Sequence, residues 1–201
     1  TPSNPRTASN TRTASRTQSA TVTVSATPVP LRNTTLSAGY QHSVAVRLDG
    51  TVRAWGGNTD GQASVPPGLR GVVAVAAGGY HTLALRANGT VVAWGRNSDG
   101  QSTVPTGLSG VVAIAAGEAH SLALKSDGTV VAWGRNTAGQ RTVPADLRTV
   151  VAISAGALHS VALRADGTVV VWGDNAFGQR DIPPTLARVT AVAAGGFHTL
   201  A

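Results

Sequence analysis

Five histidines are the residues of this sequence whose type and spacing could do chemistry. Each lies 39 residues after the one before it. An imidazole can act as a general base or bind a metal ion. An active site occurs once, however, and no carboxylate or second histidine stands at ligand spacing beside any of the five. We therefore expect no metal, and a structural role between strands or repeats for His42, His81, His120, His159 and His198.

Three aspartates could be mistaken for a catalytic carboxylate set. Asp49, Asp127 and Asp166 are each followed by glycine, which is typical of a tight hairpin turn. No P-loop, nucleophile elbow, dinucleotide fingerprint or zinc-binding helix motif occurs. The absence of cysteine removes thiolate chemistry and disulfides. The sequence therefore predicts a protein that is not an enzyme, with no catalytic residue and no cofactor.

The same 39-residue period governs several other residue types, which identifies an internal repeat. A tryptophan recurs in each complete copy, and we expect it to pack between repeats with its indole N–H hydrogen-bonded. The recurring residues are Gly39, Gly78, Gly117, Gly156 and Gly195; Trp55, Trp94, Trp133 and Trp172; and Pro66, Pro105, Pro144 and Pro183.

One repeat, Val111 to Thr149, shows a β pattern throughout. An apolar run, VVAIAAG, suits a strand covered on both faces, and SLALK alternates. Asp127-Gly128 predicts a two-residue type I′ hairpin turn, and TVVAWG predicts the returning strand. A Gly-X-Asn-X-X-Gly-Gln connector and a proline follow, and we expect the Asn and Gln to hold the loop backbone. Each repeat is thus predicted to be an antiparallel sheet of three to four strands.

Small sheets of this kind must stack to bury their faces, and radial stacking produces a propeller. We predict an all-β fold, a β-propeller built of 39-residue antiparallel blades, with four complete repeats and a partial fifth. The expected boundaries are about 31–70, 71–109, 110–148, 149–187 and 188–201.

Residues 1–30 differ in composition and are rich in Thr, Ser and Pro, with no acidic residue. Such a segment cannot bury enough apolar surface to fold, so we expect a flexible tail or linker. Residues 21–25, TVTVS, alternate like a short strand that could join a sheet edge. The chain starts at Thr1 without Met, which suggests a processed form or a fragment. No apolar run is long enough to cross a bilayer, so no membrane span is expected.

The net charge of +7 arises from fifteen Arg and one Lys against eight Asp and one Glu. The arginines are spread along the whole chain. Specific nucleic-acid recognition needs clustered cations with stacking aromatics or a recognisable reading element, and neither is visible. No specific nucleic-acid partner is expected.

The pattern AG-x-x-H-S-L-A-L-x-x-D-G-T-V-x-x-W-G-x-N-x-x-G-Q resembles the repeat of the regulator of chromosome condensation family, over Leu31 to Ala201. The resemblance implies a propeller, usually of seven blades. The founding member is a nucleotide-exchange factor for a small nuclear GTPase and uses an inserted β-wedge, for which the unbroken 39-residue period leaves no room. The family's plant photoreceptor uses a Gly-Trp-Arg-His-Thr context that is missing here. The compact Ala/Val-rich repeat looks like the bacterial branch, often secreted or on the cell surface.

Function is expected where the repeats differ, because the fold does not dictate those side chains. Arginine and aromatic residues are frequent anchors of protein contacts. The candidate partner contacts are Tyr40, Tyr80, Arg96, Arg135, Arg141, Phe177, Arg180 and Phe197, although the same residues could simply be solvated loop residues. Asn33 and Asn88 begin Asn-X-Thr sequences and are candidate glycosylation sites.

Three functions remain open from the sequence. The first is a protein or glycan interaction module on a secreted or surface bacterial protein. The second is a structural subunit of an extracellular fibre or oligomer, joined by strand addition at the incomplete last repeat. The third, which the missing insertion disfavours, is a guanine-nucleotide exchange regulator of a small GTPase.

Overall fold

The computed structural model describes residues 35–201, all within the unit Leu31–Ala201. The expected flexible tail, the strand expected at residues 21–25 and the Asn33 site lie outside the described residues and stay predictions. Every regular element of residues 35–201 is a β-strand. That part of the chain accordingly has no helix that could cross a membrane.

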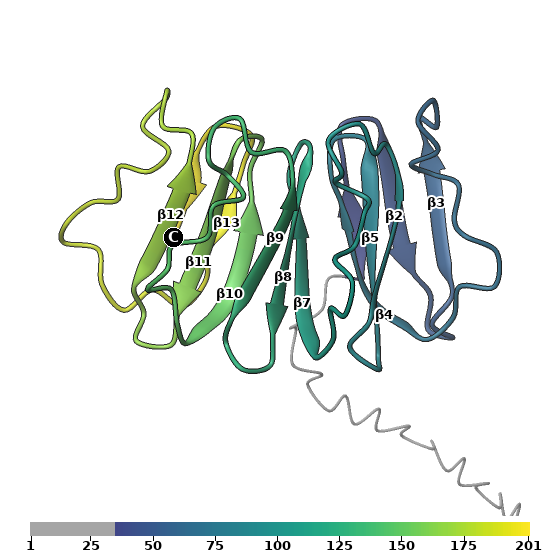
Figure 1. Ribbon diagram of the computed structural model, residues 1–201, viewed down its shortest axis with the longest axis horizontal. Coiled ribbons are helices and arrows are strands. Elements are labelled where there is room, and N and C mark those ends of the chain that lie inside the picture. The colour runs from purple at the N-terminus through teal and green to yellow at the C-terminus, as the bar shows by residue number, and fades with distance from the viewer. Residues whose placement is uncertain (1–34) are drawn as a thin grey trace, which may run out of the picture. The chain divides into compact units, whose positions relative to one another are not determined.

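The strands form successive antiparallel sheets in chain order (Figure 1). Four sheets have three strands and the fifth has two. They are β1 (Leu36–Ala38), β2 (His42–Val46) and β3 (Val52–Gly56); β4 (Val72–Ala77), β5 (His81–Arg86) and β6 (Val91–Gly95); β7 (Val111–Ala116), β8 (His120–Lys125) and β9 (Val130–Gly134); β10 (Val150–Ala155), β11 (His159–Arg164) and β12 (Val169–Gly173); and β13 (Ala193–Ala194) with β14 (Thr199–Leu200).

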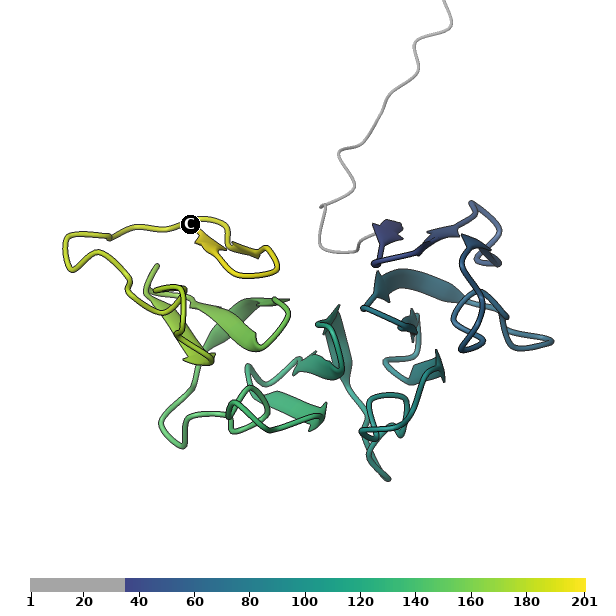
Figure 2. The ribbon, with the colours of Figure 1, turned by 90° about the horizontal axis from the view of Figure 1, so that it is seen from above.

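The sheets bury their faces against one another and follow an arc in chain order (Figure 2). Strand β8 shows how alternation serves this packing. Leu122 and Leu124 belong to the core shared with the fourth sheet, whereas Ala123 belongs to the core shared with the second. The first strands of consecutive sheets, β1, β4, β7, β10 and β13, contact their neighbours in turn. The predicted all-β propeller of four complete repeats and a partial fifth is confirmed.

Each complete blade has three strands, at the lower end of the predicted range of three to four. Residues 135–149, which connect β9 to β10, contain no strand. Asn136 accepts the backbone N–H of Arg141 through its side-chain oxygen, at 2.9 Å. This side-chain bond takes the place of a strand partner, so the connector closes on itself as a loop.

The prediction of a type I′ hairpin turn is wrong. Among residues 47–51, Gly50 has a positive φ of 73° and Asp49 does not. The N–H of Gly50 donates to the carbonyl of Arg47 at 2.9 Å, which closes a turn one residue earlier than expected. This is the longer hairpin loop, in which glycine forms a bulge after the turn. The Asp49 carboxylate accepts both the N–H and the hydroxyl of Thr51, which favours this loop.

The repeated Ala-Gly dipeptide lies where neighbouring blades approach most closely. A Cβ placed on Gly117 would come within 3.0 Å of the carbonyl oxygen of Gly156 and of the His120 ring. Gly78 and Gly156 stand in the same relation to their own neighbours. The close approach of blades at the axis therefore requires glycine here.

We expect Gly117→Ala to lower the free energy of unfolding by about 1–3 kcal/mol, because the added methyl group forces the two blades apart. Gly196→Ala is the matched control, since a Cβ there meets nothing within 4 Å. That variant should stay within about 0.5 kcal/mol of the parent chain. Urea unfolding of both variants measures the difference, and equal losses would contradict the proposed crowding.

Candidate functional site

A hydrogen-bonded latch joins each blade to the next. His81 Nε2 and Ser121 Oγ are 3.0 Å apart, and Ser121 donates to the carbonyl of Gln101 at 2.9 Å. Trp133 Nε1 donates to the same carbonyl at 2.9 Å. Since the single hydroxyl proton of Ser121 goes to Gln101, the imidazole must donate through Nε2. His81 is therefore held as the neutral Nε2–H tautomer.

The latch recurs at every boundary of the described blades. The histidine of one blade bonds the hydroxyl 40 residues later, and that hydroxyl donates to the connector glutamine's carbonyl. Trp94 repeats the indole contact, whereas Trp172 Nε1 is buried and has no hydrogen-bond partner in the described part of the chain. The triads are His42–Thr82–Gln62, His81–Ser121–Gln101, His120–Ser160–Gln140 and His159–Thr199–Gln179.

Burial keeps these imidazoles neutral. It lowers the pKa of His81 to about 4 and that of His120 to about 3, and the neighbouring histidines add to both effects. Burial also lowers the pKa of His42 and His159. Nδ1 of each of these four rings is buried and has no hydrogen-bond partner among residues 35–201, so a proton there would find no acceptor in that part of the chain. The fifth histidine, His198, is exposed.

Within residues 35–201, no three His, Asp or Glu side chains gather in a group that could hold a metal ion. The hairpin aspartates accept hydrogen bonds from residues of their own turns. Asp127 accepts the hydroxyl of Thr129 at 2.6 Å and its N–H at 3.0 Å. These bonds, with Lys125, hold the pKa of Asp127 well below its usual range. The arrangement fixes turns and blade boundaries.

Three of the candidate contacts lie together on the end of the propeller formed by the β1–β2 and β4–β5 turns. The rings of Tyr40 and Tyr80 meet edge to face, with centroids 5.8 Å apart. The Arg96 guanidinium carbon lies 5.6 Å from the centre of the Tyr80 ring, a cation–π geometry. Tyr40 is 55% exposed. This cluster offers a partner both aromatic surface and positive charge.

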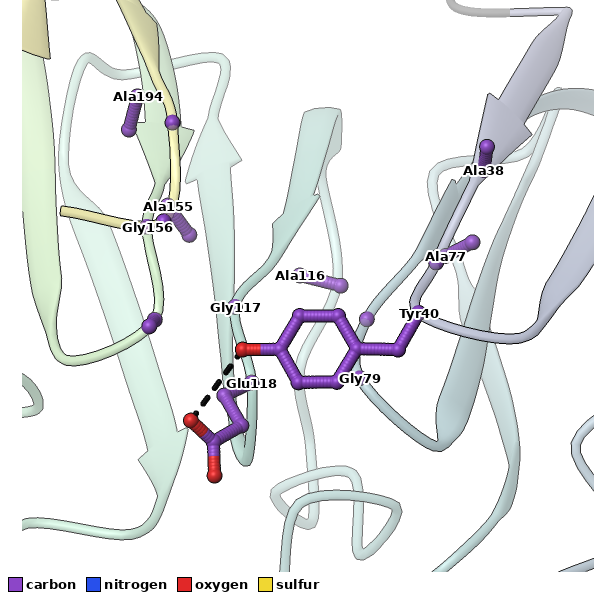
Figure 3. Close-up of a pocket in the computed structure, with 15 residues that line it drawn as sticks. Ala38, Tyr40, Ala77, Gly79, Ala116, Gly117, Glu118, Ala155, Gly156 and Ala194 are labelled. Carbon is purple, nitrogen blue, oxygen red and sulfur yellow. Dashed lines mark hydrogen bonds between the residues drawn. The ribbon is translucent and has the colours of Figure 1, made fainter. Parts of the chain in front are cut away.

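Glu118 links this cluster to the third blade (Figure 3). Tyr40 donates its hydroxyl to Glu118 Oε2 at 3.3 Å, and Arg135 Nη1 lies 3.3 Å from Glu118 Oε1. Arg135 also binds both carboxylate oxygens of Asp99, at 3.1 and 3.2 Å. Partial burial, and then the charge of Glu118, raise the pKa of Tyr40. We call Tyr40, Tyr80, Arg96, Glu118 and Arg135 the rim cluster.

The rim cluster borders a cavity of about 200 Å³ on the propeller axis. Five turns line it, and most of its residues are alanine or glycine (Figure 3). Tyr40 and Glu118 are the two lining residues with long side chains. The lining segments are residues 38–40, 77–79, 116–118, 155–157 and 194–196.

The other candidate contacts lie apart from the rim cluster. Phe177 and Phe197 form their own pair, with ring centroids 5.3 Å apart. Arg141 and Arg180 donate to the carbonyls of Gly134 and Gly173, seven residues earlier, at the ends of β9 and β12. A further candidate, the Asn88 glycosylation site, lies exposed on the β5–β6 turn.

Sequence reasoning missed Glu118, Asp99 and the hydroxyls of the latch. The hydroxyls had a detectable signal, because Ser43, Thr82, Ser121, Ser160 and Thr199 recur at the 39-residue step. Glu118 had none, since it is the sole glutamate of the chain.

The three-stranded repeats are joined by the latch around an axis, and their side chains vary at one rim. These features define a repeat β-propeller, and this fold supports a protein-interaction module. The regulator of chromosome condensation (RCC1) repeat matches residues 34–62, 72–101, 111–140 and 150–179. The chain belongs to this repeat family, as its resemblance predicted.

Solved structures share the fold. Prp20p from Saccharomyces cerevisiae, described with its binding to Gsp1p and histones, is 24% identical with a TM-score of 0.66; the match covers 80% of this chain and 53% of that one. Yeast RCC1 (Prp20) bound to Kap60 is 25% identical with a TM-score of 0.68, and the match covers 82% of this chain and 52% of that one. The ectodomain of the Physcomitrella patens receptor kinase CR4 is 24% identical with a TM-score of 0.61, and the match covers 80% of this chain and 44% of that one. The chain thus spans about half the length of these structures. No curated protein matches the sequence.

Proposed function

We propose that the chain is a non-enzymatic docking module that binds a protein through the rim cluster. The observation that carries the proposal is the gathering of non-repeating side chains at one end of the axis. At the position directly after the repeated Ala-Gly dipeptide, the five repeats carry Tyr40, Gly79, Glu118, Ala157 and Gly196. The latch residues, in contrast, are nearly constant from repeat to repeat. Side chains that the fold does not require are free to suit a partner.

The chemistry of the rim cluster favours a protein over a glycan. A sugar ring stacks on an open aromatic face, but Arg96 lies over the Tyr80 ring, and the Tyr40 and Tyr80 rings already meet edge to face. Exposed tyrosine and arginine around a hollow are frequent anchors of protein interfaces. Prp20p, which has the same fold, was described with protein partners. Glycan binding remains the weaker form of this proposal.

The test compares two double variants of the full chain. Tyr80→Ala with Arg96→Ala alters the rim, whereas Arg47→Ala with Leu48→Ala alters the exposed β2–β3 turn at the opposite ends of the strands. Proximity crosslinking in the source cells should identify a protein retained by the parent chain and the turn variant and lost, by about tenfold or more, with the rim variant. Equal loss from both variants, or none from either, would contradict rim docking. Binding to a glycan array that is lost when Tyr80 is substituted would show that the partner is a glycan and not a protein.

A second candidate function is self-assembly by strand addition. Among residues 35–201, β14 pairs with β13 alone, whereas the equivalent strands β5, β8 and β11 each have two partners. An unpaired strand edge is a site for adding another strand. Light scattering coupled to size-exclusion chromatography should then show species larger than the monomer that grow with concentration. A monomer at all concentrations would remove this candidate.

For location we propose the cell surface or the extracellular medium, in keeping with the compact repeat and the exposed Asn88 turn. Fractionation of source cells tests this, and recovery in the cytosol would contradict it. Guanine-nucleotide exchange is the least supported proposal, because every strand of residues 35–201 belongs to one of the five sheets and none forms an inserted wedge. A nucleotide-release assay should show no acceleration.

A further inference from the structure

We propose that the end of the propeller opposite the rim cluster binds a linear acidic polysaccharide through a row of basic side chains. This site is separate from the proposed protein docking site and does not depend on it. Its basic residues lie in the hairpins between the second and third strands of each blade and in the last residues of the connectors between blades. We call these residues the basic belt, and they are Arg47, Arg70, Arg86, Lys125, Arg148, Arg164 and Arg188.

The 39-residue step places basic residues that are far apart in the sequence on consecutive blades. Arg47 directly follows β2, and Arg86, Lys125 and Arg164 are the last residues of β5, β8 and β11. All four occupy the same repeat position, so each complete blade presents a cation where its hairpin begins. Even spacing along the chain thus becomes a cluster at one end of the folded propeller.

Backbone hydrogen bonds join the hairpins and connectors into one continuous edge. The N–H of Val150 donates to the carbonyl of Gly128 in the β8–β9 hairpin, at 3.2 Å. The N–H of Ala165, in the next hairpin, donates to the carbonyl of Thr149 at 2.9 Å. The end of this connector therefore lies between two hairpins, and the same two bonds recur between the earlier blades. Basic residues of hairpins and connectors accordingly alternate along the arc, except where Ser109 replaces a connector arginine.

The loops of the basic belt carry an excess of positive charge that the rim end lacks. They hold seven basic residues against four aspartates, whereas the loops at the rim end hold four arginines against five acidic residues. Lys125 and Arg164 have ion pairs, to Asp127 and Asp146, and the other five belt residues have none within residues 35–201. The belt therefore keeps unneutralised cations that attract an anion. Its loops are residues 47–51, 66–72, 86–90, 105–111, 125–129, 144–150, 164–168 and 183–189.

Two features of the basic belt favour a polysaccharide over other polyanions. A polymer that carries one acidic group on each sugar meets an equivalent cation on each successive blade, and a guanidinium binds a carboxylate through two parallel N–H donors. The belt loops contain no aromatic residue, so they offer no ring on which a nucleic-acid base could stack. They also offer no aromatic anchor for a protein interface. Recognition by charge alone fits a carboxylated sugar chain.

The probe is a dye-labelled polygalacturonate oligosaccharide, which carries one carboxylate on each sugar, titrated into the 201-residue chain. The matched neutral probe is the same oligosaccharide with its carboxylates converted to methyl esters. We expect saturable binding of the acid by fluorescence anisotropy and no binding of the ester. Binding should weaken about tenfold or more when the salt concentration rises from about 0.05 M to about 0.5 M, because salt screens exposed charges.

Two double variants locate the site. Arg70→Gln with Arg148→Gln removes two exposed cations of the basic belt, and Arg141→Gln with Arg180→Gln removes two exposed cations of the rim end. Each of these four arginines donates to a backbone carbonyl, so the two pairs are matched in hydrogen bonding as well as in charge. The belt variant should bind the acid roughly tenfold more weakly, as expected when basic residues are lost from a contact with an anionic surface. The rim-end variant should bind it as the parent chain does.

Circular dichroism verifies that each variant is folded. Equal binding of the acid and the ester, no binding of either, or equal effects of the two variants would each overturn the basic belt as a polysaccharide site. A single-stranded DNA oligonucleotide of equal charge tests the other polyanion. If the oligonucleotide bound through the belt more tightly than polygalacturonate, the ligand would be a nucleic acid and the polysaccharide would be rejected.

Discussion

Trp133→Ala is expected to lower the free energy of unfolding by about 3–5 kcal/mol, the range for removing a large aromatic side chain from a core. Trp133 is 5% exposed, joins the core between the second and third sheets, and donates to the Gln101 carbonyl. The substitution removes packing and a hydrogen bond at one boundary together. Urea-induced unfolding followed by circular dichroism measures the loss.

Trp55→Ala is the matched control, since it removes a residue of the same type at the same repeat position. Trp55 is 52% exposed, because the described residues contain no blade before the first for it to pack against. The expected loss is below about 1 kcal/mol, as for most surface substitutions. If the two variants lost similar stability, the tryptophan would act within its own sheet and the boundary argument would fail.

Stability is expected to fall as pH decreases below about 6.5, before most carboxylates titrate. The pKa of His81 is about 4 and that of His120 about 3 in the folded chain, against an ordinary 6.5. Between these values the unfolded chain binds more protons, so acid favours unfolding, and above about pH 7 the contribution is constant. Within this interval, each pH unit changes the free energy of unfolding by about 1.36 kcal/mol per histidine. His81 alone therefore accounts for a loss of roughly 3 kcal/mol once the pH has fallen through the interval between its two pKa values.

Unfolding free energies measured at several pH values between about 6.5 and 5 isolate the histidines, because ordinary carboxylates titrate near 4. His120→Asn should reduce the slope of stability against pH over this interval, whatever it does to stability at neutral pH. An unchanged slope would show that His120 is not held neutral by its burial in the folded chain.

Most of the fold could be predicted from the sequence because the 39-residue step applies at once to His120, Trp133 and Gly117. Stacking was then a physical necessity for sheets with two apolar faces. The turn type was not predictable in the same way. Asp127-Gly128 suits two hairpin loops, and the choice depends on which residues of β8 and β9 pair, which is decided by packing between blades.

The candidate site was predictable only in part. Variation between repeats pointed to Tyr40, Tyr80 and Arg96, which do lie together. The contact between Tyr40 and Glu118 joins residues 78 apart and depends on the curvature of the arc, which no local pattern encodes. Arg141 has the same residue type as Arg135 but bonds the end of β9, because the loop brings its guanidinium back to Gly134.

The latch has a consequence for how such proteins change in length. Every His-to-hydroxyl bond spans 40 residues and uses groups that each copy carries. Recombination that inserts or removes one whole coding segment for a repeat therefore leaves each remaining histidine with a hydroxyl to meet. Copy number can drift in a lineage while each junction stays chemically intact, and the rim side chains are then free to diverge copy by copy.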